Sequence, residues 1–178
     1  MASVLSHPAA ALGLGPWFGP AALGRRVVVV GVVCSILPDI DAIGFWLGVP
    51  YGSPLGHRGL THSIVFSAAL AALVVGAGFR LHPARGALFG FLFLSGASHG
   101  FFDAMTDGGR GIALFWPLTD RRFFLPWRPI RVAPIGVTGL SGARAVAIFK
   151  TELLWVWLPC LILWSCGRLV KDSARGRG

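Results

Sequence analysis

Long apolar runs separated by short basic turns limit the folds that are open to this chain. Residues 64–79 and 86–105 predict two membrane segments. The runs at residues 27–37 and 153–163 are shorter, and the former cannot cross a bilayer alone because a crossing helix needs about 20 residues. The runs lack the period-two alternation of strands, and an open sheet edge cannot face lipid. The sequence therefore predicts an all-α integral membrane bundle of about four to five helices.

The composition and the placement of the charges support membrane insertion and argue against nucleic-acid binding. Hydrophobic residues make up 54% of the 178 residues and charged residues only 13%, whereas soluble domains carry about 25% charged residues. The net charge of +9 raises the alternative of nucleic-acid binding. The basic residues, however, stand between the apolar runs, where they anchor helices at lipid headgroups. We expect a multi-pass protein of the plasma (inner) membrane, with membrane lipid as its partner and no nucleic acid.

The organisation along the chain indicates one domain. Residues 8–23 predict a short first helix that ends near prolines. Residues 106–145 are rich in Gly, Pro and Arg and predict a long irregular segment, on the surface or re-entrant, before the last helix. We expect a single membrane-embedded helical domain over residues 1–170 and a basic, disordered tail over residues 171–178.

Ionisable side chains gather at particular ends of the apolar runs. Each costs about 2.5–3.5 kcal/mol inside a membrane segment, so each is a functional candidate. The candidates are His7, Asp39, Asp41, His57, His62, His99 and Asp103. Because successive helices run in opposite directions, all seven are expected to reach the same face of the bundle. His82 falls on the other face and is discarded.

Histidine and aspartate at one level of a membrane predict a metal site. Neutral imidazoles and carboxylates are ligands that zinc, manganese and iron prefer. We expect divalent ions, zinc first with manganese or iron as alternatives, and seven candidates leave room for two or more ions. Each residue alone has a simpler interpretation; Asp39, for example, could close a turn after Pro38. His99 and Asp103 are harder to dismiss, since their spacing places both on one helix face. Arg58, Thr61, Ser63 and Thr106 could orient the ligands.

Three motifs carry a family resemblance. Leu-Pro-Asp-Ile-Asp at 37–41, His-Arg-Gly-Leu-Thr-His-Ser at 57–63 and Ser-His-Gly-Phe-Phe-Asp-Ala-Met-Thr at 98–106 resemble the YdjM family of bacterial inner-membrane proteins. The resemblance covers residues 7 to about 130 and leaves the C-terminal helix unsupported. It implies a metal-dependent hydrolase in which the seven candidates match the family's His and Asp positions. The family's remoter similarity to helical zinc phospholipase C and nuclease-like enzymes implies phosphoester hydrolysis. Asp107 departs from the turn-former expected there.

The leading hypothesis is therefore a membrane-embedded hydrolase that cleaves a phosphoester or lipid-like substrate with a metal-activated water. Asp41, His62 and Asp103 are its candidate catalytic residues. An anionic headgroup would be attracted by four arginines, at positions 58, 121, 122 and 128. Two alternatives stay open: a non-catalytic metal-binding membrane protein, structural or regulatory, and an ion or proton transporter. The basic turns at Arg25–Arg26 and Arg80–Arg85 favour a site that faces away from the cytoplasm.

Overall fold

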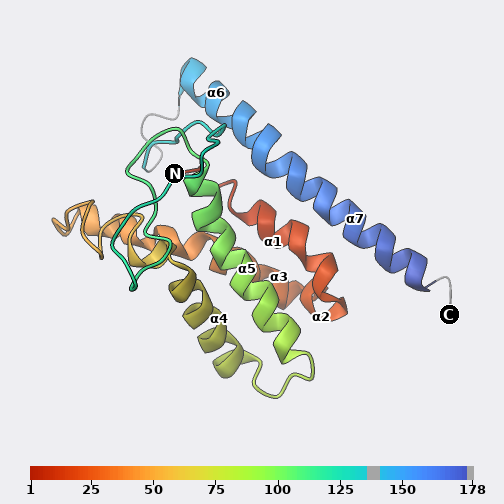
Figure 1. Cartoon of the computed structure of the whole chain (residues 1–178). Helices are drawn as coiled ribbons and strands as arrows, with labels where there is room; N and C mark the ends of the chain where they lie inside the picture. The colour runs from red at the N-terminus through yellow and green to blue at the C-terminus, as the bar shows by residue number, and fades with distance from the viewer. Residues whose placement is uncertain (136–140, 176–178) are drawn as a thin grey trace.

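The computed structural model describes residues 1–135 and 141–175, and these form helices joined by irregular segments (Figure 1). No strand occurs among the described residues, which contain only isolated bridges. The chain begins with α1 (Pro8–Leu14), a 3-10 turn η1 (Gly15–Phe18) and α2 (Pro20–Leu23). A proline stands in the first turn of each of these pieces, where its missing N–H costs no helical hydrogen bond. The short, proline-interrupted first helix is confirmed.

The second apolar run is longer than the sequence indicated. Helix α3 (Arg25–Ile36) passes directly into the 3-10 segment η2 (Leu37–Phe45). The prediction that the run ends at Pro38 was wrong because Pro38 occupies the first turn of η2, a position that tolerates proline. Together they form a predominantly apolar helical stretch of 21 residues, long enough to cross a membrane. Asp39 and Asp41 consequently lie on a helical segment rather than beyond one.

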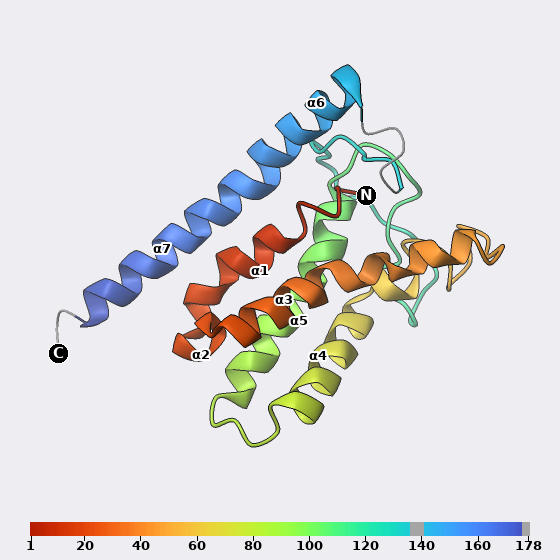
Figure 2. The same ribbon diagram turned by 180° about the vertical axis from the view of Figure 1, so that it is seen from behind.

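Helices α4 (Ile64–Gly78) and α5 (Arg85–Ala104) form an antiparallel hairpin, and the 3-10 turn η3 (Leu60–His62) precedes it. Helix α5 packs between α3 and α4, and the view from behind shows α3 crossing it (Figure 2). Its inward side chains Leu88, Phe91 and Leu92 are fully buried in a core that they share with the neighbouring helices. This apolar layer fills the bundle between the Arg85 end and the His99 end of α5.

The last helix is one long element. Helix α6 (Gly142–Glu152), a π turn η4 (Leu153–Trp157) and α7 (Leu158–Arg175) follow one another without a break. The predicted start near residue 153 was wrong, because residues 142–152 are amphipathic and hide a helix from a search for uniformly apolar runs. The helix also includes part of the tail expected to be disordered; residues 176–178 lie outside the described part of the chain. Helix α1 packs against α7 (Figures 1 and 2).

Residues 106–135, which follow α5, form a long irregular segment, as the sequence predicted, and this segment lies around the end of α5 (Figure 1). Isolated bridges join Thr106 to Ile130 and Ile112 to Phe123. The Ala133 N–H donates to the Met1 carbonyl oxygen at 2.9 Å, which ties the N-terminal segment to this region. Both segments therefore lie over the end of α5 that carries His99 and Asp103.

Within the described chain, two helical stretches are long and apolar enough to cross a membrane, Arg25–Phe45 and Gly142–Ser173. The apolar helix Ile64–Gly78 is shorter. Helix α7 exposes a continuous series of large apolar side chains, including Leu158, Leu161, Ile162 and Leu169. Exposed apolar surface of this extent marks contact with lipid or another protein. The all-α membrane bundle is confirmed.

Candidate metal centre

The structure brings the predicted site residues to one end of the bundle. His99 and Asp103 stand one turn apart on α5, Asp39 lies on η2, and His62 ends η3. His62, His99 and Asp103 are buried. Gly100 allows η3 to approach α5 closely, since a Cβ atom at Gly100 would lie 2.8 Å from the His62 carbonyl oxygen.

Four side chains form an inner group with the spacing of a tetrahedral metal site. Asp39, His62, His99 and Asp103 each offer one ligand atom, all within 4.8 Å of one another. The His62 and His99 Nε2 atoms are 3.1 Å apart, and Asp39 Oδ1 lies 3.3 Å from His99 Nε2. Nε2 of His62 is 3.5 Å from Asp103 Oδ2 and 3.8 Å from Asp39 Oδ1. Bonds of about 2.0–2.1 Å place tetrahedral ligands about 3.3–3.4 Å apart, which lies within this range.

The hydrogen bonds leave these ligand atoms available. His99 Nδ1 lies 2.8 Å from the Ser35 carbonyl oxygen and therefore donates, which leaves Nε2 without a proton in the neutral ring. Asp39 Oδ1 and Oδ2 are buried without a hydrogen bond, whereas Asp103 Oδ2 lies 3.0 Å from the Arg58 Nε and 3.5 Å from the His62 Nε2. Buried carboxylate oxygens require a compensating partner. A divalent cation would supply it, so the residues present fit a metal ion.

Asp41 and His57 lie one layer further out. Asp41 Oδ1 is 2.6 Å from His57 Nδ1, and Oδ2 is 3.1 Å from His62 Nδ1. Oδ2 also accepts from the Arg58 N–H and the Thr61 hydroxyl. Asp41 thus orients His62 so that Nε2 faces the inner group, as carboxylates behind metal-binding histidines do. Asp41, His57 and His62 also form a second group able to hold an ion.

His7 approaches the inner group from α1 but does not join it. Its ring stacks on His99, with centroids 3.7 Å apart, and its Nε2 lies 3.9 Å from Asp103 Oδ1. Burial lowers the pKa of His7 to about 3, which keeps the ring neutral. For His62, burial also lowers the pKa, but hydrogen bonds with Asp103 and Asp41 outweigh it and raise the pKa to about 9.

Arg58 is a fully buried cation beside the inner group. Its Nε lies 3.0 Å from Asp103 Oδ2, and its Nη2 and Nη1 donate to the Thr106 hydroxyl and the Gly108 carbonyl oxygen. Its φ of 62° is a left-handed conformation, which costs about 1–3 kcal/mol in a residue other than glycine. These contacts agree with the ligand-orienting role that the sequence suggested for Arg58, and its burial argues against its other suggested role, the attraction of an anionic headgroup.

Other polar residues singled out in the sequence have structural partners. Arg122 donates to the carbonyl oxygens of Tyr51, Ser53 and His57, and so fastens the loop before η3. Ser63 caps α4 by accepting from the Phe66 N–H. Arg121 and Arg128 are exposed on the irregular segment, as are Arg110 and Arg131.

Sequence reasoning missed Glu152. This buried carboxylate on α6 accepts hydrogen bonds from the Ser3 N–H and from the hydroxyls of Ser3 and Ser6. It thereby holds the segment that leads to His7. An acidic residue shortly before an apolar run was the signal available, but residues 142–152 were not recognised as helical.

The fold and these contacts define a class: a helical membrane protein that gathers, at one end of its bundle, a buried histidine–aspartate group that could hold a metal ion. The chain matches the model of the YdjM inner membrane protein family over residues 1–173. It is 38% identical over 165 residues to "Inner membrane protein YbcI" of Escherichia coli (strain K12), a match that covers 92% of this chain and 95% of that protein. No solved structure matches the chain.

The chain therefore belongs to the YdjM inner membrane protein family, and it is an inner membrane protein. The family match extends beyond the expected residues 7–130 and includes most of the last helix. Most of the C-terminal helix, which the sequence motifs left unsupported, therefore lies within the region that the family model matches.

Proposed function

We propose that this protein is a metal-dependent hydrolase that cleaves a phosphoester of a lipid-like substrate at the membrane interface. The observation that carries the proposal is the near-tetrahedral spacing of the ligand atoms of Asp39, His62, His99 and Asp103, with both Asp39 oxygens unpaired. Two imidazole nitrogens with carboxylate oxygens suit zinc. When bound, such an ion supplies a Lewis acid for hydrolysis.

Arg58 and a bound metal ion would compete for the Asp103 carboxylate, which favours a catalytic site with three protein ligands over a closed site with four. Asp39, His62 and His99 offer three ligand atoms, whereas Asp103 Oδ2 is shared with the Arg58 guanidinium at 3.0 Å. Catalytic zinc sites combine three protein ligands with one open position. The Asp39 side chain is 10% exposed while the others are fully buried, so substrate would enter from the Asp39 side.

The remaining residues have definite tasks in this proposal. Asp103 accepts a proton from the attacking water, and Arg58 beside it favours the ionised carboxylate beforehand. His7 stays a neutral imidazole and packs against the His99 ring, with centroids 3.7 Å apart, which holds that ligand in place. Asp41 keeps the Nε2 atom of His62 directed at the site.

An apolar groove supports a lipid-like substrate. It has a volume of about 570 Å³ and is formed by α1, α4, α5, α7 and the irregular segment. Phe102 and Ala104, the chain neighbours of Asp103, both line it, together with Ile64 and Leu114. An acyl chain in this groove would bring its headgroup near the metal centre.

A structural metal clamp is the second candidate. It is favoured by the burial of His62, His99 and Asp103 and by a spacing that four protein ligands can satisfy without an open position. In that arrangement Asp103 is a ligand, and the ion joins η2, η3 and α5. An apolar layer of Leu88, Phe91 and Leu92 beyond the site argues against the transporter alternative.

Asp103→Asn separates the two candidates. Detergent-purified wild type, Asp103→Asn and His62→Ala are compared for metal content by elemental mass spectrometry and for hydrolysis of a chromogenic phosphodiester and of phospholipid micelles. For a hydrolase, the wild type is active, Asp103→Asn keeps its zinc but loses activity by about 10²–10⁴-fold, and His62→Ala loses both. The control Asp107→Asn alters a carboxylate outside the inner group and should retain metal and activity. Zinc-loaded wild type inactive on all substrates, with zinc lost in Asp103→Asn, would establish the clamp instead.

We further propose that α4 and α5 cross the membrane as a hairpin, which makes the protein multi-pass. Fifteen residues of α4 span about 22 Å, less than the hydrocarbon thickness of about 30 Å. Local thinning of the bilayer and snorkelling of the flanking arginines accommodate such a short helix.

A further inference from the structure

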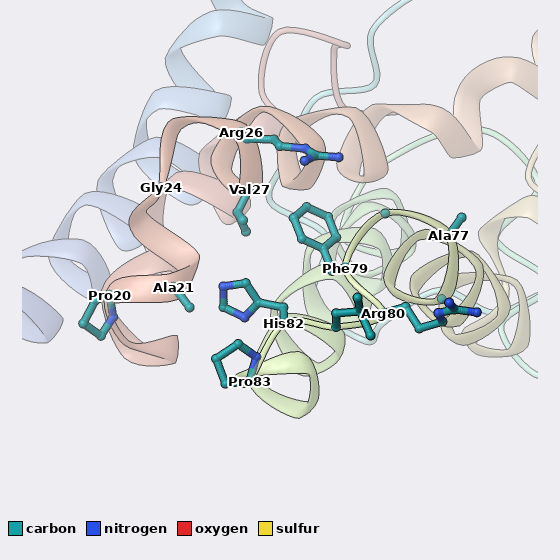
Figure 3. A pocket seen from close by; sticks show the side chains of 13 residues that line it. Pro20, Ala21, Gly24, Arg26, Val27, Ala77, Phe79, Arg80, His82 and Pro83 are labelled. Atoms are coloured by element: carbon teal, nitrogen blue, oxygen red, sulfur yellow. The ribbon is translucent and has the colours of Figure 1, made fainter.

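A second polar feature lies at the opposite end of the bundle from the metal centre. A cavity of about 930 Å³ opens between α2, the start of α3, the end of α4 and the turn that follows it (Figure 3). Its lining residues are Pro20, Ala21, Gly24, Arg26, Val27, Gly76, Ala77, Gly78, Phe79, Arg80, Leu81, His82 and Pro83. The metal site uses none of them.

The polar side chains of this basic cavity are all potential hydrogen-bond donors. The Arg26 guanidinium stands over the Phe79 ring, 5.0 Å from its centroid (Figure 3). His82 Nδ1 accepts from the Ala84 N–H at 3.1 Å, so the proton of the neutral ring is on Nε2, which can donate. Arg80 adds a second guanidinium to the lining. Neither arginine has an ion pair in the described part of the chain, and no acidic residue lines the cavity.

The backbone adds to this positive potential. Helix α3 starts at the cavity wall, where its N-cap Gly24 provides no side-chain hydrogen bond and its first turn holds no acidic residue. Its first N–H groups therefore lack helical acceptors and carry the positive end of the helix dipole. Together with Arg26 and His82, they form a concave site that suits an anion.

The position of the cavity relative to the membrane points to lipid as the source of that anion. Arg26 begins one apolar segment and Arg80 follows the end of another, which places both at headgroup level. Most of the lining is apolar, including Pro20, Val27 and Phe79. Such surface contacts the glycerol and upper methylene groups of a lipid, whereas free phosphate gains nothing from it. Basic pockets between membrane helices bind anionic headgroups in this way.

We infer that the basic cavity binds the phosphate headgroup of an anionic phospholipid in the leaflet opposite the metal centre. The inference rests on the proposed crossing of the α4–α5 hairpin, but it is independent of the proposed hydrolysis, because no residue is shared and no reaction is involved. It assigns a resident lipid to the seam between α2–α3 and α4–α5.

Lipid-dependent thermal stability of the full-length protein tests this assignment. The protein in neutral detergent is titrated with phosphatidylglycerol or phosphatidylcholine, and unfolding is followed by tryptophan fluorescence. We expect phosphatidylglycerol to raise the Tm and phosphatidylcholine and inorganic phosphate to leave it unchanged. Arg26→Gln/Arg80→Gln should raise the phosphatidylglycerol concentration for the half-maximal shift by about 10- to 30-fold. The matched control Arg144→Gln/Lys150→Gln removes two exposed cations of α6, outside the cavity, and should respond as the wild type does.

Ala77→Trp provides a second variant that keeps every charge. Ala77 lines the cavity and is exposed, so an indole there fills volume without disturbing the core. We expect it to weaken the phosphatidylglycerol response as well. A wild-type response in both the arginine and the tryptophan variants would overturn the inference, as would equal losses in the control pair. A Tm increase with inorganic phosphate as large as with phosphatidylglycerol would show that the cavity takes free phosphate rather than lipid.

Discussion

Arg58 sets the charge balance of the metal centre, since its guanidinium and a bound ion would both act on Asp103 Oδ2. In the metal-free protein, Arg58→Met removes the cation nearest to Asp103 and leaves only His62, at 3.5 Å, to balance this buried charge, which should cost up to about 3–5 kcal/mol of unfolding free energy. With zinc bound, the ion replaces the missing charge, so the loss should be smaller. The variant should also bind zinc more tightly, because a competing cation has been removed.

Thermal unfolding with and without zinc, and competition with a chelator, measure these two effects. Arg131→Met is the control: its ion pair with Asp107 is 3.4 Å long and exposed, so its removal should cost less than about 1 kcal/mol. Weaker zinc binding in Arg58→Met would mean that Arg58 holds Asp103 in place for the metal rather than competing with it.

Two histidines give the metal-free protein a stability maximum near pH 6.5. The pKa of His62 is raised to about 9, so its stabilising proton is fully present below pH 6.5 and lost as the pH rises through 9. The pKa of His7 is lowered to about 3, so the unfolded chain takes up a proton preferentially as the pH falls below 6.5. We expect the Tm of chelator-treated protein to fall on both sides of this pH. With zinc the alkaline decline should disappear, since metal binding displaces the His62 proton. A flat profile above pH 6.5 without metal would contradict this account.

The meeting of the candidate residues at one end of the bundle could be predicted from the sequence, but their individual contacts could not. Ionisable side chains at the ends of apolar runs are costly, so His99 and Asp103 stood out without any structure. The sequence did not indicate that Asp41 would lie behind His62, or that His7 would stack on His99 instead of entering the inner group. These outcomes depend on ångström-scale packing between segments far apart in the chain.

Among the secondary-structure elements, α6 is joined to the N-terminal segment by the hydrogen bonds that Glu152 accepts from Ser3 and Ser6. The π turn that follows Glu152 directly is a local distortion of the kind that often accompanies functional positions. Glu152→Ala removes the acceptor for Ser3 and Ser6, and buried groups left unpaired cost about 1–3 kcal/mol each. We expect a destabilisation of a few kcal/mol and faster hydrogen exchange over residues 1–14.

Glu152→Gln is the matched control, because the amide keeps one carbonyl acceptor and should retain part of the protection. The zinc content should be unchanged in both variants, since no residue of the inner group lies on α6. Unchanged exchange at residues 1–14 in Glu152→Ala would show that the other contacts of α1 with α7 suffice to hold the segment.

The helices themselves were predicted where the sequence is uniformly apolar and missed where it is not. Runs such as α4 are recognisable by composition alone. The continuation of α3 through Pro38 depends on the proline falling in the first turn of a 3-10 segment, and the start of the last helix depends on an amphipathic stretch. Both features are local, but a search for apolar runs does not detect them.

For the molecule as a whole, the alternating direction of its helices was enough to predict which groups meet. By the same reasoning, if the α4–α5 hairpin crosses the membrane, the metal centre and the basic cavity lie on opposite sides of it. Leu55 and Leu81 are exposed loop residues at these two ends. After Cys166→Ser removes the exposed native thiol, Leu55→Cys and Leu81→Cys can be labelled separately with a membrane-impermeant maleimide.

We expect Leu55→Cys to react in intact spheroplasts and Leu81→Cys to react only in inverted vesicles, since the basic turn beside Leu81 favours the cytoplasm. Reaction of both from the same side would mean that the hairpin does not cross, leaving Arg25–Phe45 and Gly142–Ser173 as the membrane spans. The reverse pattern would keep the crossing but place the metal centre at the cytoplasmic face. In that case the arginines of the irregular segment would outweigh those of the turns, and a substrate would have to come from the inner leaflet.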